Sequence, residues 1–175
     1  MTHSPTVLVV GGGATGTGIA RDLTLRGVDV MLIERDGLSS GASSRSHGLL
    51  HSGARYAEDD PVGARECIVE NRTLRSIAGA CIRDTGGLFV QLAGDDAAYF
   101  DEKHAACEEI GIETTLLDGD EARAQVPGLS ADVERALQVP DGVVYPSRLC
   151  AANAADAEAH GATVHPHAPL EELVV

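Results

Sequence analysis

The sequence predicts an α/β fold in three layers, followed by the beginning of a second, α+β domain. Short apolar strands alternate with amphipathic helices along the 175 residues, which is the order that builds parallel sheets. A glycine-rich turn joins the first predicted strand to the first helix. A strand-like stretch also runs to the last residue with nothing to cover it, so we expect the fold to be incomplete at its C-terminus and the chain to be a fragment.

The first half of the chain is predicted to contain strand 6–10, helix 14–26, strand 28–34, a polar loop at 35–56 and helix 61–83. Both strands are short and rich in β-branched and aliphatic residues, as buried parallel strands are. The first helix carries its apolar residues at helical spacing and ends at Gly27. Pro61 opens the second helix, and an apolar stripe continues along it as far as Ile82.

The second half is predicted to contain strand 88–92, helix 96–110, strand 113–117, helix 120–125, strands 136–139 and 143–145, helix 146–160, and strands that start at 162 and 170. The turn Pro140-Asp141-Gly142 predicts a hairpin between two of these strands. We expect residues 1–84 to begin one domain, residues 85–145 to begin a second, and residues 146–175 to return to the first.

Charge is distributed unevenly along the chain. The formal net charge is −14, yet residues 1–56 hold four acids and five arginines, whereas the rest holds 23 acids and eight basic residues. The N-terminal region therefore suits an anionic ligand, while the remainder would repel nucleic acid, so no nucleic-acid partner is expected. Lys103 is the only lysine. This composition fits either a protein kept soluble in high salt or a gene of high GC content.

The four cysteines are widely spaced and form no CxxC pair, which predicts no metal site and free thiols in a reducing compartment. His165 and His167 lack acidic or thiol partners and do not change that prediction. The N-terminus lacks the pattern of a signal peptide, and no apolar run approaches the roughly 18 residues of a membrane span. We therefore expect a soluble, cytoplasmic protein.

The glycine-rich turn, GGGATG, has the G-x-G-x-x-G spacing of a dinucleotide-binding loop. Its first glycine allows a tight turn, its second lets the backbone approach a pyrophosphate, and its third lets helix and strand pack closely. The helix N-terminus then offers free amides and a partial positive charge. Glu34 lies 18 residues beyond the last glycine, near the spacing expected of a ribose-binding carboxylate, and it would repel the 2′-phosphate of NADP. The pyrophosphate is expected at Gly11, Gly13, Ala14, Thr15 and Gly16.

The loop that follows, SSGASSRSHGLLHSGARY at residues 39–56, is too polar for a core element. A simple NAD-binding unit would continue directly into its next strand and helix. Hydroxyls, glycines and Arg45 instead suit a backbone wrapped around a second phosphate and a ring, which favours FAD. A disordered lid is the alternative.

In these motifs, and in "ARECIVEN", "GLFVQL" and "VPDGVVYPSRLCAAN" farther along, the chain resembles the FAD-dependent glycerol-3-phosphate dehydrogenases of the D-amino-acid-oxidase-like flavoproteins. It is most similar to the anaerobic type, and to its A subunit in particular. The resemblance implies a Rossmann-like, glutathione-reductase-like FAD-binding domain. It also implies oxidation of sn-glycerol 3-phosphate to dihydroxyacetone phosphate by hydride transfer to the flavin. Electrons would pass to quinone through partner subunits, with the protein peripheral at the inner face of the membrane.

By this resemblance, Glu34 and Arg35 serve the adenosine, Arg55 faces the substrate phosphate with Tyr56 beside it, and His51 is the candidate catalytic residue. The loop residues that match the flavin lining are Ser43, Ser44, Ser46, Gly48, Leu49 and His51, and Arg45 is also expected to bind the cofactor. His51 could instead anchor the loop, and Arg55 could instead pair with an acid at 58–60. Tyr145 stands where related chains carry an acid, and the catalytic base is expected beyond residue 175.

Two other functions remain open at this point. One is a flavin oxidase of an amino or hydroxy acid, whose carboxylate an arginine would bind equally well. The other is a non-catalytic, truncated dinucleotide-binding remnant.

Overall fold

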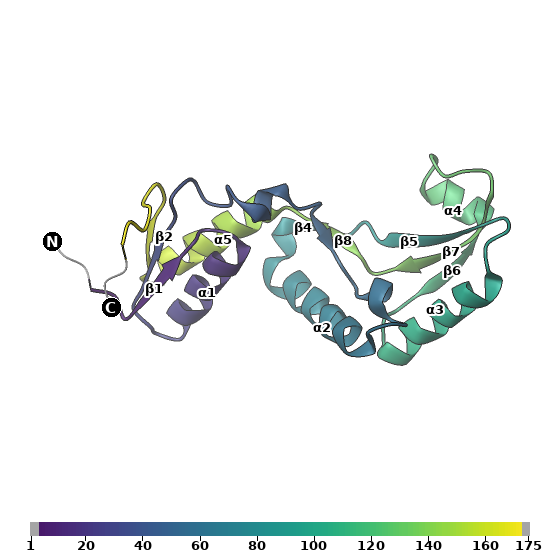
Figure 1. Cartoon of the computed structure of the whole chain (residues 1–175), viewed down its shortest axis with the longest axis horizontal. Helices are drawn as coiled ribbons and strands as arrows, with labels where there is room; N and C mark the ends of the chain where they lie inside the picture. The colour runs from purple at the N-terminus through teal and green to yellow at the C-terminus, as the bar shows by residue number, and fades with distance from the viewer. Residues whose placement is uncertain (1–3, 173–175) are drawn as a thin grey trace. The chain divides into compact units, whose positions relative to one another are not determined.

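The computed structural model describes residues 4–172 (Figure 1). Within them the chain forms two compact units: unit 1 comprises residues 4–48 and 144–172, and unit 2 comprises Leu49–Val143. The first division falls inside the polar loop. The expected domain limits, 1–84, 85–145 and 146–175, concern which residues serve the cofactor and which the substrate, and they remain a prediction.

Unit 1 contains β1 (Val7–Val10), α1 (Ala14–Leu25), β2 (Val30–Ile33), a 3₁₀ turn (Ala42–Arg45), α5 (Pro146–Ala159) and β9 (Thr163–His165). The strands form one sheet in the order β1-β2-β9, and both pairings are parallel. Figure 1 shows α1 and α5 lying side by side against this sheet. The predicted βαβ start of an α/β fold is confirmed.

The core of unit 1 explains why these strands form. Val9, Val30 and Leu32 are buried against Ala20 of α1 and Ala157 of α5. Side chains alternate between the faces of a strand, so these positions point toward the helices. A fully buried side chain of this size contributes about 1.5–3 kcal/mol. The core therefore fixes the turn between β1 and α1, which carries the glycine motif.

Unit 2 contains β3 (Leu49–Leu50), a 3₁₀ turn (Ala54–Tyr56), α2 (Pro61–Ala78), a 3₁₀ turn (Gly79–Cys81), β4 (Ile82–Arg83), β5 (Gly87–Leu92), α3 (Ala97–Ile110), β6 (Thr115–Asp118), α4 (Gly119–Gln125), β7 (Val133–Val139) and β8 (Gly142–Val144). One sheet has the order β5-β7-β6 and is antiparallel, and a smaller one has the order β3-β8-β4. Buried apolar side chains, among them Ile68 of α2, Cys107 of α3 and Leu137 of β7, form its core.

The predicted hairpin around Pro140-Asp141-Gly142 is wrong. β8 pairs antiparallel with β3, with Leu49 opposite Val143, and not with β7. The carbonyl oxygens of Pro140 and Asp141 accept hydrogen bonds from the side chain of Arg75 on α2 instead of from a neighbouring strand. The turn therefore redirects the chain from one sheet to the other.

The predicted end of helix 61–83 is also wrong, because α2 ends at Ala78. Gly79 is a poor helix former, and the β-branched Ile82 begins a short strand beside β8. Residues 170–172, where a last strand was expected, lie in no strand, and residues 173–175 lie outside the described part.

Within residues 4–172, no helix combines the length and the apolar character that crossing a membrane requires. The four cysteines are free, and three of them are buried. No cluster of metal-ligating side chains occurs in the same range.

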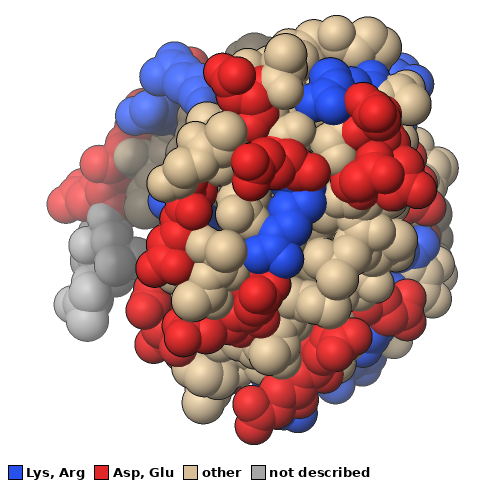
Figure 2. All heavy atoms as spheres, turned by 90° about the vertical axis from the view of Figure 1, so that its right-hand side faces the viewer, with Lys and Arg blue, Asp and Glu red and all other residues tan. Residues whose placement is uncertain are grey.

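Figure 2 shows one face of the molecule, on which acidic side chains lie in several groups with basic side chains among them. With a net charge of −14, like charges repel in the folded state, and added salt screens this repulsion. We predict that Tm rises when KCl is increased from about 0.1 M to about 2 M. If composition reflects only codon usage, Tm measured by circular dichroism will stay constant over this range.

Candidate dinucleotide site and anion pocket

The turn between β1 and α1 has the geometry of an anion-binding loop. The amide of Gly11 donates to the carbonyl oxygen of Ile33 on β2 at 2.8 Å, which closes the turn onto the sheet. α1 begins at Ala14, and its first turn carries no acidic residue. The first amide, that of Ala14, donates to a side-chain hydroxyl, and the partial positive charge of this end of the helix suits a negatively charged group.

Position 16 requires a glycine because the backbone of Gly11 passes very close to it, and not because of its φ angle. A Cβ built on Gly16 would overlap the carbonyl oxygen of Gly11 and stand 3.0 Å from its carbonyl carbon. Only hydrogen fits there. This contact is what lets α1 start so close to the end of β1, as the third glycine of the motif predicts.

Glu34 lies at the end of β2 and faces the same turn. Its Oε2 accepts from the Gly12 amide at 2.7 Å, and its Oε1 accepts from the Asp36 amide at 2.9 Å. These bonds, that from Asp36 first, hold the pKa of the Glu34 carboxyl below its usual value. A carboxylate can accept about four hydrogen bonds, so Glu34 keeps capacity for ribose hydroxyls. Beside it, Arg35 is exposed and bonds to Asp36 at 3.2 Å.

Gly12 is a site residue that the sequence did not indicate. It falls between the first two motif glycines, yet its amide holds Glu34, and a Cβ there would meet Leu38 Cδ2 at 2.7 Å. The only signal was that Gly12 is the middle residue of three consecutive glycines, GGG. A cleft of about 280 Å³ lies next to this pair, lined by Val10, Gly11, Ile33, Glu34, Arg35 and the segment Ala168–Leu170.

Replacing Glu34 by glutamine is predicted to weaken FAD binding about tenfold, because an amide offers one oxygen acceptor in place of two.

The folded-state pKa of Glu34 is depressed, so the stabilisation from Glu34 is present above about pH 4.5 and is lost as the pH falls through the folded pKa. The Tm difference between wild type and Glu34→Gln should be present at about pH 6 and shrink below about pH 4. An equal difference at both pH values would contradict this role.

The serine-rich loop of unit 1 reaches the start of α1. Ser43 accepts from the Ala14 amide at 2.9 Å through Oγ, so an anion bound there would share or replace this contact. Gly48 is buried, with a φ of +68°, and accepts from the Val144 amide at 2.8 Å. Exposed positions are occupied by Ala14, Thr15, Ser44, Arg45 and Ser46. The loop residues and the glycine turn are thus brought together at Ser43.

In unit 2, a pocket of about 310 Å³ is lined by three of the remaining predicted site residues, Leu49, His51 and Arg55. Its lining comprises Leu49, His51, Ala54, Arg55, Gly87, Leu88, Phe89 and Asp141. Arg55 is exposed, and its guanidinium has no hydrogen-bond or ion-pair partner among residues 4–172. Tyr56 does not line the pocket, and its ring centre lies 6.4 Å from that of His51.

Two of the three acids at 58–60 are engaged elsewhere, and the third, the exposed Asp59, forms no ion pair with Arg55 in the described part of the chain. Glu58 pairs with Lys103, and Asp60 caps α2 by accepting from the Gly63 amide at 2.9 Å. Arg55 is therefore an unneutralised cation at a pocket. A guanidinium in this state suits a phosphate or a carboxylate.

A set of polar contacts from α2 holds the backbone of this pocket. The buried Asn71 donates through Nδ2 to the carbonyl oxygens of Leu50, His51 and Pro140, at 3.0–3.3 Å. Asp141 accepts from the Ser52 amide at 2.7 Å. Asn71 is the last residue of "ARECIVEN", a stretch that supported the family resemblance but gave Asn71 no role. Its signal was a polar residue on the buried face of the helix, three positions after Ile68.

Comparison with known proteins supplies independent evidence. Residues 6–175 match the family described as "DAO: FAD dependent oxidoreductase". The A1 subunit of the anaerobic glycerol-3-phosphate dehydrogenase of Haloferax volcanii is 54% identical over 175 residues, which is all of this chain and 30% of that protein. The corresponding A subunit from Escherichia coli K12 is 49% identical over 163 residues, 93% of this chain and again 30% of the relative. The chain spans about 30% of the length of these curated relatives.

Solved structures agree on the fold. L-proline dehydrogenase from P. horikoshii has a TM-score of 0.77 and 26% identity, over 95% of this chain and 45% of that one. L-alpha-glycerophosphate oxidase from Mycoplasma pneumoniae, solved with FAD bound, has a TM-score of 0.79 and 16% identity, over the same shares of the two chains. From the family match over residues 6–175, together with the glycine turn and Glu34, we conclude that the chain belongs to the FAD-dependent oxidoreductases.

Proposed function

We propose that this chain is part of an FAD-dependent dehydrogenase that oxidises sn-glycerol 3-phosphate to dihydroxyacetone phosphate. The observation that carries the proposal is Arg55, an exposed guanidinium at a pocket with no acid paired to it among residues 4–172. A dianionic phosphate calls for such a forked, permanent charge. The relatives at 54% and 49% identity are named as glycerol-3-phosphate dehydrogenases.

The residues of unit 1 fit the cofactor. Gly16 leaves room for the close turn, the start of α1 presents free amides, and Glu34 offers lone pairs beside a cleft. These features suit the pyrophosphate and adenosine of FAD, and the negative charge of Glu34 disfavours the 2′-phosphate of NADP. When bound, FAD supplies the acceptor for the hydride that leaves C2 of the substrate.

In unit 2, Arg55 binds the substrate phosphate, and Tyr56 stands next to it in the chain. His51 lines the same pocket, and its carbonyl oxygen is held by Asn71 at 3.0 Å. Three roles are open to its ring: to accept the proton of the substrate hydroxyl, to orient the flavin, or to anchor the loop. The first role would be supported if kcat, measured as a function of pH, falls on the acid side with an apparent pKa typical of histidine.

We further propose that the protein works within a membrane-associated complex of several subunits. The relatives are named as subunits, and partner subunits would pass electrons from the reduced flavin to quinone. The protein would then lie on the cytoplasmic side, peripheral at the inner face of the membrane.

The experiment that tests this function uses the full-length product of the gene that encodes the chain. The purified protein should show flavin absorbance, and glycerol 3-phosphate should bleach it under anaerobic conditions. Bleaching by an amino or hydroxy acid instead would assign it to the flavin oxidases. Absence of bound flavin, or a gene that stops at Val175, would support the non-catalytic remnant.

A further inference from the structure

We propose that Lys103 is a positioning residue that keeps Arg55 available to an anionic substrate by holding Glu58 away from it. This inference rests on the proposed function and adds to it a residue far from Arg55 in sequence. All the groups concerned belong to unit 2.

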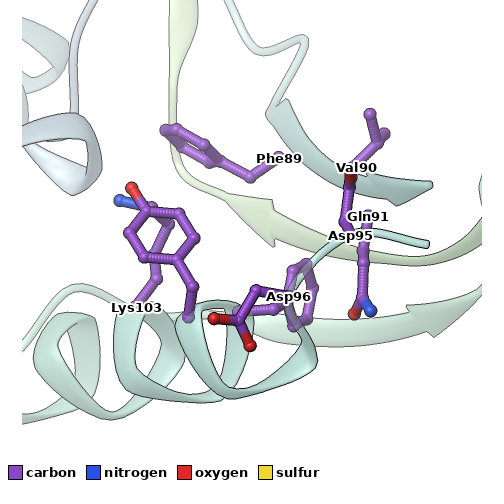
Figure 3. A pocket seen from close by; sticks show the side chains of 8 residues that line it. Phe89, Val90, Gln91, Asp95, Asp96 and Lys103 are labelled. Atoms are coloured by element: carbon purple, nitrogen blue, oxygen red, sulfur yellow. The ribbon is translucent and has the colours of Figure 1, made fainter. Parts of the chain in front are cut away.

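Lys103 is the only lysine of the chain, and it is 5% exposed. Its Nζ lies 2.5 Å from Oε2 of Glu58, with the rings of Phe89 and Tyr99 centred 5.1 and 5.4 Å away. Figure 3 shows Lys103 extending from α3 with its amino group on the side of Phe89. A cation placed over aromatic faces and bonded to a carboxylate is held in one position.

The charge on Lys103 is maintained despite its burial. Burial lowers the pKa of the ammonium, but the hydrogen bond and the negative charge of Glu58, with smaller contributions from Tyr99, together outweigh this and bring the pKa above its usual value. Glu58 is therefore paired with a full positive charge at neutral pH. Its own side chain is 19% exposed, so it retains room to turn if that partner is lost.

Glu58 stands three residues after Arg55, just beyond the turn that contains Arg55. Residues Ala54–Tyr56 form a 3₁₀ turn, and Ala57 continues it with helical backbone angles. In helical backbone of this kind, side chains three positions apart lie on the same side. Arg55 is also the cation nearest in sequence to Glu58. A half-buried carboxylate without a partner is unfavourable. Without Lys103, pairing with Arg55 would relieve it and would remove the charge that the substrate needs.

The test uses the full-length, FAD-loaded protein. Lys103→Met is expected to raise the KM for glycerol 3-phosphate and the Kd for inorganic phosphate, measured by calorimetry, about tenfold with little change in kcat. The double variant Glu58→Gln/Lys103→Met removes the competing acid as well. It should return both constants to within about twofold of wild type. Lys103→Arg keeps the charge and should behave as wild type.

The matched control is Arg135→Met. Arg135, on β7, pairs at 2.6 Å with Asp101 on α3, the helix that also carries Lys103, and it lies over the Phe100 ring. Within residues 4–172 it bonds to neither Glu58 nor the Arg55 turn. Its KM should stay unchanged while its Tm falls. FAD absorbance and Tm report the folding of every variant. Should Lys103→Met not fold, Lys103→Leu, which likewise has no donor for Glu58, gives the same comparison.

The outcomes separate the two proposals. If Lys103→Met and the double variant raise KM equally, the pair is only structural and the inference is overturned. If Arg55→Ala raises KM but Lys103→Met leaves it unchanged, this inference fails while the proposed function stands. If Arg55→Ala itself has no effect on KM, the proposed function fails first.

Discussion

Arg55→Ala is expected to raise the KM for glycerol 3-phosphate about 100-fold, because a bidentate, charge-assisted contact of about 3 kcal/mol is lost. The side chain has no partner within residues 4–172 whose loss would destabilise the fold. FAD content and Tm should therefore stay at the wild-type level. Steady-state kinetics, with the flavin absorbance of each preparation, checks the result.

Arg65→Ala is the matched control for Arg55→Ala. Arg65 is an exposed arginine of the same unit, on α2, and it does not line the pocket. Its replacement should leave KM unchanged. Arg55→Lys should fall between wild type and Arg55→Ala, since a lysine keeps the charge without the fork. Equal KM values for all three variants would show that the phosphate is bound elsewhere.

Gly16→Ala is expected to abolish FAD retention and to lower Tm strongly. The added Cβ would overlap the carbonyl oxygen of Gly11, which is backbone and cannot move without opening the turn. Overpacking of this kind costs about 1–3 kcal/mol or more, and the amides at the start of α1 would shift from the pyrophosphate. Flavin absorbance after gel filtration and a thermal melt measure both effects.

The same helix offers a matched control in Gly18. A Cβ there would meet nothing closer than Asn153 Nδ2 at 4.0 Å. Alanine is favoured over glycine in a helix by about 1 kcal/mol, so Gly18→Ala should bind FAD normally and melt at the same or a higher temperature. Loss of FAD in both variants would mean that any change in α1 disrupts binding, and the specific role of Gly16 would be contradicted.

Local patterns were enough to predict the βαβ start of the fold. The spacing of glycines and Glu34 along 24 residues encodes both the turn and the acid beside it, because each contact joins elements that are neighbours in sequence. The resemblance to a known family, carried by the loop at 39–56, is likewise confirmed by the comparisons.

Contacts between distant segments could not be predicted. The Pro140-Asp141-Gly142 turn looks local, but Asn71 and Arg75 bind its carbonyl oxygens from a helix more than 60 residues away, so the hairpin did not form. Lys103 and Glu58 are 45 positions apart, and no periodicity relates them. The sequence therefore left open whether Glu58 pairs with Arg55, and only the folded arrangement of α3 answers it.

The assignment of the cofactor depends on one arrangement, in which the amides at the first turn bind a diphosphate while Glu34 binds the attached ribose. A crystal structure of the full-length protein with FAD tests it most directly. We predict pyrophosphate oxygens within hydrogen-bond distance of the turn at Gly11–Gly16 and a ribose hydroxyl donating to Glu34. A flavin nucleotide bound elsewhere, with Glu34 contacting only the Gly12 and Asp36 amides, would contradict this arrangement.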